Sequence, residues 1–582
     1  MISSFEPIIL IYGILNRLPK KRIIQIYFSL FLMILSALSE SLTLSISLPF
    51  LASLSNPRKL YEFKLINYFL SFFSIDSSNN LIIPVVIIFC IAICISAALR
   101  LLNIWVNCKV IALIGNDLGR LGYSNILKQS YSFHIDTKSS QLITGLTSKL
   151  EYCLESIYSS FQFFLSIAIS FSIILTLLFI NWQSTILSTF IFLIIYLLIS
   201  SKSRKYLTAN SKLISQVTDQ QVRFIQNGLG NIREIILGQL QNKYVSIYGE
   251  IDREMRTRYA NNRFIGLFPR YILEAAAICI VSILSIFLFS ETSNSKIPVA
   301  ILGSLALGAQ KLLPALQNIY NSWANISSRK SEIESVLKIL NLKSKLIFTK
   351  ELQNFPEKNN LINFKNVTFV YKKLNSIVFK NINLSIPLEK KIGIIGTTGS
   401  GKSTFIDLLM GFILPTEGEI IINNKPLRNK KNLREWQNCI SHVPQDIYIS
   451  DISIAENIAF GLNKNEINIA RLKEAAKIAE IDEFIESLQS KYNTKLGERG
   501  MQLSGGQRQR LGIARAIYRK TKIIILDEAT SALDVKTEKR IFENINKFLK
   551  NKTILMITHR PNTLEKFDHI YKVEKQTITK LK

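Results

Sequence analysis

The sequence predicts a chain of two parts, an all-α transmembrane domain with six helices followed by an α/β domain. Apolar runs long enough to cross a bilayer fall in the first part, at 23–53, 81–107, 157–181, 183–200, 271–290 and 298–320. A glycine-rich motif between a buried strand and a helix falls in the second part. A chain of 582 residues also exceeds one ordinary core and divides into at least two domains.

Basic residues set the orientation of the six predicted spans. Arg17, Lys20, Lys21 and Arg22 precede the first span, which places the N-terminus in the cytoplasm. The long segments 108–156 and 201–263 are rich in Lys and Arg and are cytoplasmic in the same scheme. Six spans then return the chain to the cytoplasm, where ATP is available to the second domain.

The glycine-rich motif covers residues 396–403 and fits the phosphate-binding pattern G-x-x-x-x-G-K-[ST]. A strand over 392–395 and a helix over 404–409 give it the context that it requires. Glycines let the backbone curve around phosphate, and the helix N-terminus adds a positive dipole end. Lys402 is expected to reach the β- and γ-phosphates of ATP, and Ser403 to bind Mg²⁺.

A second strand, predicted over 523–526, ends in two carboxylates, Asp527 and Glu528. Asp527 is suited to hold Mg²⁺ through water, and Glu528 to polarise the water that attacks the γ-phosphate. The alternative is a solvated acidic turn after a core strand.

The stretch Leu503-Ser504-Gly505-Gly506-Gln507 resembles the signature motif of ABC ATPases. Other elements of that family follow in order. The resemblance implies that Tyr371 stacks on adenine, Gln445 links γ-phosphate and Mg²⁺ to the membrane domain, Asp534 lies in the D-loop, and His559 contacts γ-phosphate. The implied site has catalytic residues Glu528, His559 and Gln445, and Mg²⁺ ligands Ser403, Gln445 and Asp527. Its ATP-binding residues are Tyr371, Gly396, Thr397, Thr398, Gly399, Ser400, Gly401, Lys402, Ser403, Thr404, Ser504, Gly505, Gly506, Gln507 and Asp534.

A membrane domain ahead of the ATPase resembles a half-transporter of the type IV exporter group. In that comparison residues 1–22 hold an elbow helix, 23–335 the transmembrane domain, 336–361 a linker and 362–582 the ABC ATPase. Residues 497–500 resemble the exporter X-loop, and 130–137 and 234–243 lie where the family has its coupling helices. ATP would be held between the phosphate loop of one subunit and the signature of another. The simplest assembly is a homodimer; a heterodimer with a related half-transporter remains open.

The formal charge of +29 does not predict a nucleic-acid partner. The excess Lys lies in membrane-proximal loops, where anionic lipid headgroups are the simpler partner. A soluble two-cassette ABC protein would lack the six spans and would carry a second phosphate loop. The six cysteines show no metal-type spacing. The expected location is the inner (plasma) membrane of a bacterium, with the N-terminus and ATPase cytoplasmic.

Charged residues inside apolar spans are costly and therefore mark candidate substrate contacts. Arg270 and Lys311 are predicted to line a cavity that accepts an anionic headgroup. For Arg270 the alternative is an i,i+4 pair with Glu274. For Lys311 it is an interhelical ion pair with Glu40 or Glu274.

A polar stripe on the apolar segment 57–75 predicts an external helix, unless neighbouring helices simply extend there. An external helix in this place, the 269–274 segment and the 443–448 segment resemble flippases for lipid-linked oligosaccharides. The leading hypothesis is therefore a flippase for a glycolipid or polysaccharide precursor. A broad exporter of hydrophobic drugs or lipids is the alternative, and an ATP-gated membrane regulator is a third, from another class. A peptide exporter or an importer fits less well.

Overall fold

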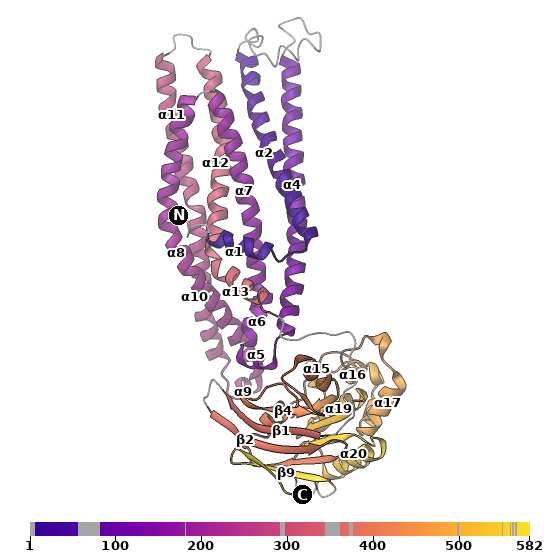
Figure 1. The fold of residues 1–582 in the computed structure, drawn as a ribbon. Helices are drawn as coiled ribbons and strands as arrows, with labels where there is room; N and C mark the ends of the chain where they lie inside the picture. Colours follow the sequence, from indigo (N-terminus) through magenta and orange to yellow (C-terminus); the bar gives the residue numbers. More distant parts are fainter. Residues whose placement is uncertain are drawn as a thin grey trace. The chain divides into compact units, whose positions relative to one another are not determined.

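The computed structural model describes residues 6–55, 82–180, 182–291, 297–343, 361–371, 376–497, 500–549, 551–558, 560, 564 and 567–582. The chain divides into two compact units, Met1–Gln129 with His134–Ser344 and Ser130–Phe133 with Lys345–Lys582. Figure 1 shows the first unit as helices and the second as sheets covered by helices. This confirms the predicted fold class, a helical region followed by an α/β domain.

Long helices make up the first unit, joined by short ones. They are α1 (Glu6–Leu15), α2 (Lys20–Ser55), α4 (Ile82–Leu127), α5 (Tyr131–Asp136), α6 (Ser139–Leu146), α7 (Ser148–Ile180), α8 (Trp182–Gly230), α9 (Ile232–Leu237), α10 (Gln241–Leu267), α11 (Pro269–Glu291), α12 (Ile297–Ser328) and α13 (Lys330–Leu340). Helices lie at both predicted coupling segments, α5 at 130–137 and α9 at 234–243. The predicted external helix at 57–75 lies outside the described residues.

Among the described residues, four stretches are long and apolar enough to cross a membrane: Lys20–Ser47, Val85–Leu127, Ser139–Phe179 and Thr185–Gly230. They correspond to the first four predicted spans. Helices α11 and α12 cover the fifth and sixth predicted spans. Neither contains one of the four stretches named above, so the count of six spans stays a prediction. Helices α4 and α8 continue far beyond the predicted spans, because the polar segments that follow the apolar runs remain helical.

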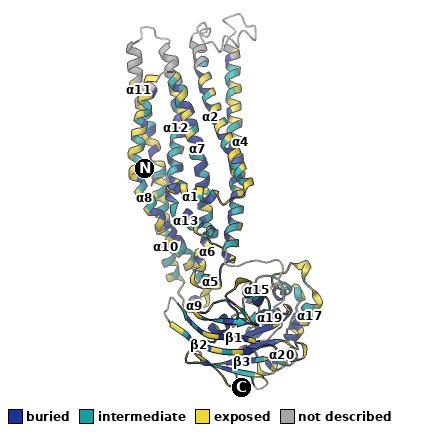
Figure 2. Ribbon diagram, in the orientation of Figure 1, coloured by how far each residue is buried: buried dark blue, intermediate teal, exposed yellow. Residues whose placement is uncertain are grey.

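The core of the first unit lies where α2, α4, α7 and α12 pack together, with α1 and α13 closing one end. Ile114, Ile157 and Ile173 are fully buried there. Large apolar side chains such as Leu101, Trp105 and Phe179 remain exposed on the outside of the helices. Figure 2 shows this exposed surface along the bundle. An apolar exterior of this size suits a lipid environment.

Helix α13 occupies the first part of the segment predicted as a linker, 336–361. It packs on α7, α8 and α4, and its residues Ile333, Val336 and Leu340 are buried. The regular apolar spacing of these positions explains why the chain stays helical past residue 335. The division between the units falls after Ser344, inside the predicted linker.

Two sheets form the second unit. One has the order β2-β1-β4-β5 and contains β1 (Leu361–Tyr371), β2 (Ser376–Pro387), β4 (Glu417–Ile422) and β5 (Lys425–Pro426). The other has the order β10-β9-β3-β8-β7-β6 and contains β3 (Lys391–Ile395), β6 (Ile440–Val443), β7 (Ile523–Asp527), β8 (Thr553–Ile557), β9 (His569–Glu574) and β10 (Thr577–Lys580). Strands β9, β3, β8, β7 and β6 are parallel to their neighbours in this order.

Both faces of the parallel sheet are covered. Along β7, Ile524 and Leu526 belong to one apolar core, whereas Ile523 and Ile525 belong to the other. The covering helices are α14 (Lys402–Leu409), α15 (Lys430–Asn438), α16 (Ile454–Ile458), α17 (Ile469–Ile478), α18 (Asp482–Ser487), α19 (Gly505–Tyr518) and α20 (Val535–Phe548). Burial on two faces explains the continuous apolar runs that the sequence shows at β7 and β8.

Candidate ATP site

The parallel sheet brings the predicted ATP residues to one edge. Strand β8 lies between β3 and β7, and β6 lies on the far side of β7. The phosphate-binding motif follows β3, Glu528 follows β7, Gln445 comes two residues after β6, and Thr558 follows β8. Ligands of parallel α/β sheets bind at the carboxyl ends of the strands, and this edge is that place.

The loop of residues 396–401 has the backbone that its glycines allow. Gly401 has φ +103°, and a Cβ there would lie 2.9 Å from Val378 Cγ1. A Cβ on Gly396 would lie 2.5 Å from the carbonyl oxygen of Val573. The Lys402 ammonium donates to the carbonyls of Gly396 and Thr397, both at 2.9 Å. The side chain of Lys402, the first residue of α14, therefore folds back onto the phosphate-binding loop.

The two carboxylates after β7 lie in different settings. Burial, and then the neighbouring Glu528, raise the pKa of Asp527 to about 6, and Lys402 opposes this shift. Glu528 has a left-handed backbone, φ +48°, and its amide donates to the Ile557 carbonyl at 3.1 Å. A bulky residue in this conformation is strained and is held by its surroundings.

Gln445 and Glu528 meet across the sheet edge. Gln445 Nε2 donates to Glu528 Oε2 at 2.9 Å, although the two residues are 83 positions apart. The sequence assigned both to one site, and their side chains do touch.

The oxygen donors at this edge fit a magnesium ion. Ser403, Gln445 and Asp527 offer hydroxyl, amide and carboxylate oxygens, which Mg²⁺ prefers. The raised pKa of Asp527 also indicates a carboxylate whose negative charge a bound cation would stabilise.

Asp407 on α14 is a residue of this region that sequence reasoning missed. Burial and the charge of Asp527 raise the pKa of Asp407 to about 6. The available signal was a carboxylate five positions after Lys402, inside the apolar run of residues 405–409.

The signature motif caps α19. Ser504 Oγ accepts a hydrogen bond from the Gln507 amide at 3.2 Å, and Gln507 Oε1 accepts one from the Ser504 amide at 2.8 Å. This reciprocal capping box leaves the amides of Gly505 and Gly506 at a positive helix end. A Cβ on Gly506 would lie 3.2 Å from the Ala532 carbonyl oxygen, so the motif packs closely on the D-loop.

Asp534 has a structural role that the sequence did not reveal. Its carboxylate accepts from the Thr537 amide at 2.9 Å and caps α20. Hydrogen bonds from the side chain and then the backbone of Thr537 lower the pKa of Asp534. Tyr371 lies near the phosphate-loop helix, with its hydroxyl 3.2 Å from Thr404 Oγ1.

His559 lies outside the described residues, but its neighbours are anchored. Arg560 Nη1 contacts the buried Glu538 carboxylate at 3.0 Å, and Thr530 Oγ1 donates to the same carboxylate at 2.8 Å. Glu538 therefore ties the D-loop to the segment that carries His559. Sequence reasoning missed this residue too, because a Glu inside a polar-faced helix gives no distinguishing signal.

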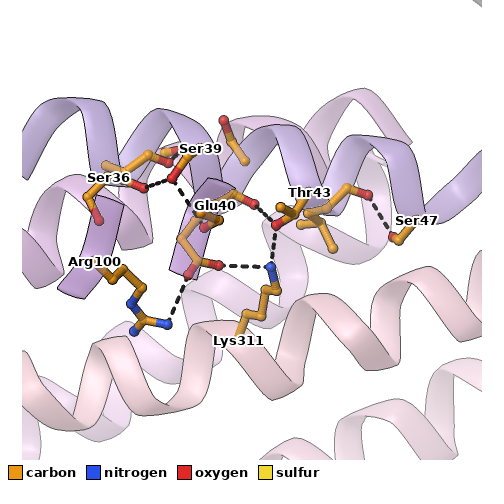
Figure 3. A network of polar contacts seen from close by, with 12 residues as sticks. Ser36, Ser39, Glu40, Thr43, Ser47, Arg100 and Lys311 are labelled. Carbon is orange, nitrogen blue, oxygen red and sulfur yellow. Dashed lines mark hydrogen bonds and ion pairs between the residues drawn. The ribbon is translucent and has the colours of Figure 1, made fainter. Parts of the chain in front are cut away.

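Ion pairs hold both cations that the sequence assigned to a substrate cavity. Figure 3 shows Lys311 Nζ reaching Glu40, at 2.8 Å, and also contacting Thr43. Arg100 contacts the same Glu40 carboxylate at 2.9 Å. Arg270 pairs with Glu274 at 2.8 Å on its own helix. The ion-pair alternatives given for Arg270 and Lys311 are therefore present in this structure, and the predicted substrate cavity stays a prediction. Sequence reasoning missed Arg100, although its position inside the predicted span 81–107 was the available signal.

Comparisons with known proteins agree with this architecture. The family model "ABC transporter" matches residues 379–531, and "ABC transporter transmembrane region" matches residues 26–307. The heterocyst differentiation ATP-binding protein HepA of Nostoc sp. is 30% identical over 453 residues, which cover 77% of this chain and 72% of that protein. The ATP-dependent lipid A-core flippase of Wigglesworthia glossinidia brevipalpis is 31% identical over 491 residues, 81% of this chain and 80% of that protein.

A solved structure has the same fold. The ATP-bound structure of a bacterial Atm1-family ABC exporter superposes with a TM-score of 0.78 at 20% identity, covering 97% of this chain and 95% of that one. Together with the motifs gathered at one sheet edge, these matches show that the chain belongs to the ABC transporter family, as an exporter half-transporter with an ATP-hydrolysing ABC domain fused to its membrane region.

Proposed function

We propose that the protein works as a homodimer in which two ATP sites are shared between subunits. The chain carries one phosphate loop, at 396–403, and one signature, at 503–507. Each site then combines Lys402 and Glu528 of one subunit with Ser504 of the other. Both motifs are intact in this chain, which favours two copies of it over pairing with a different half-transporter.

The chemistry within each site follows from the side chains. Lys402 leaves its own loop carbonyls to bind the β- and γ-phosphates. Ser403, Asp527 and Gln445 would hold Mg²⁺, which would supply positive charge to offset that of the phosphates. Glu528 orients and polarises the attacking water, with Gln445 and His559 beside the γ-phosphate. ATP drives transport only because it binds the closed dimer more tightly than the open one.

For the substrate, we propose a lipid-linked or otherwise amphipathic molecule with an anionic headgroup, such as a glycolipid or polysaccharide precursor. The observation that carries this is the charge of the Glu40 network, where one carboxylate faces two cations. Its side chain is 7% exposed, whereas those of Lys311 and Arg100 are 33% and 54% exposed. A net positive charge at the depth of the predicted spans is costly unless an anion offsets it. The flippases named among the relatives are consistent with this proposal.

Flipping in reconstituted vesicles tests the proposal. Wild-type protein should move a fluorescent, phosphate-bearing glycolipid across the bilayer in an ATP-dependent way. Lys311→Met should stop flipping while basal ATP hydrolysis survives, because it removes the positive charge in excess of Glu40, leaves Arg100 to pair with that carboxylate and lies outside the ATP site. Lys330→Met is the matched control, since Lys330 forms an ion pair with Glu6 at 2.8 Å outside the predicted spans.

Three outcomes would contradict the proposal in different ways. Full flipping by Lys311→Met removes the anionic-headgroup contact. Efflux of hydrophobic dyes without glycolipid movement indicates a broad drug or lipid exporter. ATP hydrolysis that moves neither class of substrate indicates a membrane regulator.

A further inference from the structure

Gln509, on the first turns of α19, contacts the loop that carries the catalytic carboxylate. Its Oε1 accepts a hydrogen bond from the Ala532 amide at 2.9 Å, and its Nε2 donates to Ser531 Oγ at 2.9 Å. The same Nε2 lies 3.5 Å from the Glu528 carbonyl oxygen. Gln509 is 6% exposed, so these contacts are shielded from water. Both polar groups of this buried amide have hydrogen-bond partners. The contact is stable, because losing one partner would leave a desolvated polar group.

The neighbours of Gln509 do not make this connection. Arg508 donates to the Leu503 carbonyl at 3.1 Å, and Arg510 to the Glu480 carbonyl at 2.5 Å. Gln507 turns back to cap the helix at Ser504. Among the described side chains of α19, Gln509 is the one that hydrogen-bonds the 528–532 turn. It therefore links the start of α19 to the backbone at Glu528.

The two ends of this link belong to different ATP sites in the shared-site dimer. Ser504, at the start of α19, serves the ATP held by the partner subunit. Glu528 serves the ATP held by its own subunit. A displacement of α19 on engaging the partner's γ-phosphate is therefore passed by Gln509 to the strained backbone of Glu528 and to the D-loop.

We propose that Gln509 is a positioning residue that couples the two ATP sites: occupancy of one site sets the alignment of Glu528 in the other. This inference rests on the shared-site dimer proposed above. Gln509 touches neither ATP nor water in this role. It acts through the backbone of Glu528, so its loss should lower the rate of hydrolysis and leave ATP binding at the phosphate loop nearly unchanged.

The first measurement is the split between binding and turnover. In the homodimer, Gln509→Ala should lower kcat about 10-fold or more while the Kd for ATP changes less than about twofold. Arg508→Ala is the matched control, because the Arg508 side chain instead donates to the Leu503 carbonyl. A Gln509→Ala protein with wild-type kcat, or one whose only defect is a raised Kd, overturns the proposal.

The second measurement isolates coupling from a loss of local structure. Mixed dimers are purified with two different tags, and one subunit always carries Glu528→Gln, so that only the other, active subunit turns over. Gln509→Ala is placed in the active subunit and Lys402→Ala in the inactive one. Closed dimers are quantified by cross-linking, and the turnover rate is expressed per closed dimer. If Gln509 carries the coupling, emptying the inactive site slows the active subunit when Gln509 is intact and has little further effect when it is absent.

If Gln509 has a purely structural role, the two substitutions act independently because they lie in different subunits. Their effects on the turnover rate then multiply. Independent effects would therefore reject the coupling. Failure of the shared-site dimer is recognised separately, by placing Ser504→Arg in the inactive subunit. If the active subunit then hydrolyses ATP normally, its site does not use the partner's signature, whatever Gln509→Ala does.

Discussion

Gln445 Nε2 lies 2.9 Å from Glu528 Oε2, which joins the loop after β6 to the carboxylate after β7. The amide donor occupies one of the two carboxylate oxygens and fixes the orientation of the group. In the proposed mechanism this carboxylate orients and polarises the attacking water.

Glu528→Gln tests that assignment. The substitution removes the carboxylate that polarises water, while Asp527 and Ser403 still hold Mg²⁺. Turnover should fall at least about 100-fold, the usual range for loss of a general base. ATP binding should persist and trap a nucleotide-bound dimer, visible by size and by retained nucleotide. Lys402→Ala should instead weaken ATP binding itself, and wild-type turnover by Glu528→Gln would remove the catalytic assignment.

The shared site is tested by complementation. Ser504→Arg places a bulky cation at the start of α19, which should block hydrolysis of the partner's ATP without unfolding the exposed helix end. Lys402→Ala blocks the subunit's own phosphate loop. Each homodimer should be inactive, yet mixing the two subunits should restore activity, because a mixed dimer contains one intact composite site. The measurement is ATPase activity of the purified proteins before and after subunit exchange.

Much of the ATP site was predictable because its residues have local signals. The glycines, Lys402 and Ser403 form one contiguous motif, and Asp527 and Glu528 end an unmistakable apolar strand. The contacts of Gln509 and Glu538 were not predictable, since they join segments whose proximity depends on how α19 and α20 pack on the sheet. The same reason applies to Asp407, whose raised pKa depends on burial beside Asp527.

The membrane region shows the same limit more sharply. Apolar length predicted where the helices lie, since backbone hydrogen bonding in lipid permits little else. It could not predict which charges meet. Glu40, Arg100 and Lys311 lie on α2, α4 and α12, and only the packing of these three helices shows that one carboxylate serves two cations.

The Glu40 network makes a stability prediction. Lys311→Met should be tolerated, because Arg100 still compensates the buried Glu40 carboxylate. Removing both cations with Lys311→Met and Arg100→Met leaves that carboxylate unpaired, which should cost about 3–5 kcal/mol. The double variant should therefore unfold at a clearly lower temperature in detergent. Adding Glu40→Gln should restore most of the loss, and equal stability of the double variant and wild type would contradict the network.

Glu332 predicts that the stability of the first unit depends on pH. This residue of α13 is 2% exposed and accepts a hydrogen bond from Ser211 Oγ at 3.0 Å. Burial raises the pKa of Glu332 from 4.5 to about 7. The folded protein thus keeps a proton that the unfolded chain has released, so stability falls as pH rises from about 4.5 to 7 and stays low above it. The full difference amounts to about 3 kcal/mol at pH 8.

Glu332→Gln should remove this dependence, because a neutral amide preserves the shape of the protonated acid without an ionisable proton. Thermal unfolding of the detergent-solubilised protein should show a higher Tm for the variant at pH 8 and little difference at pH 4.5. Glu334→Gln is the matched control on the same helix. Glu334 lies in a more exposed i,i+4 contact with Lys330, at 3.8 Å, where screening makes ion pairs weak. Because Ser211 can hydrogen-bond the amide as well as the acid, a Glu332→Gln protein that is less stable than wild type at pH 8 would mean that the buried carboxylate is ionised and compensated in the folded protein.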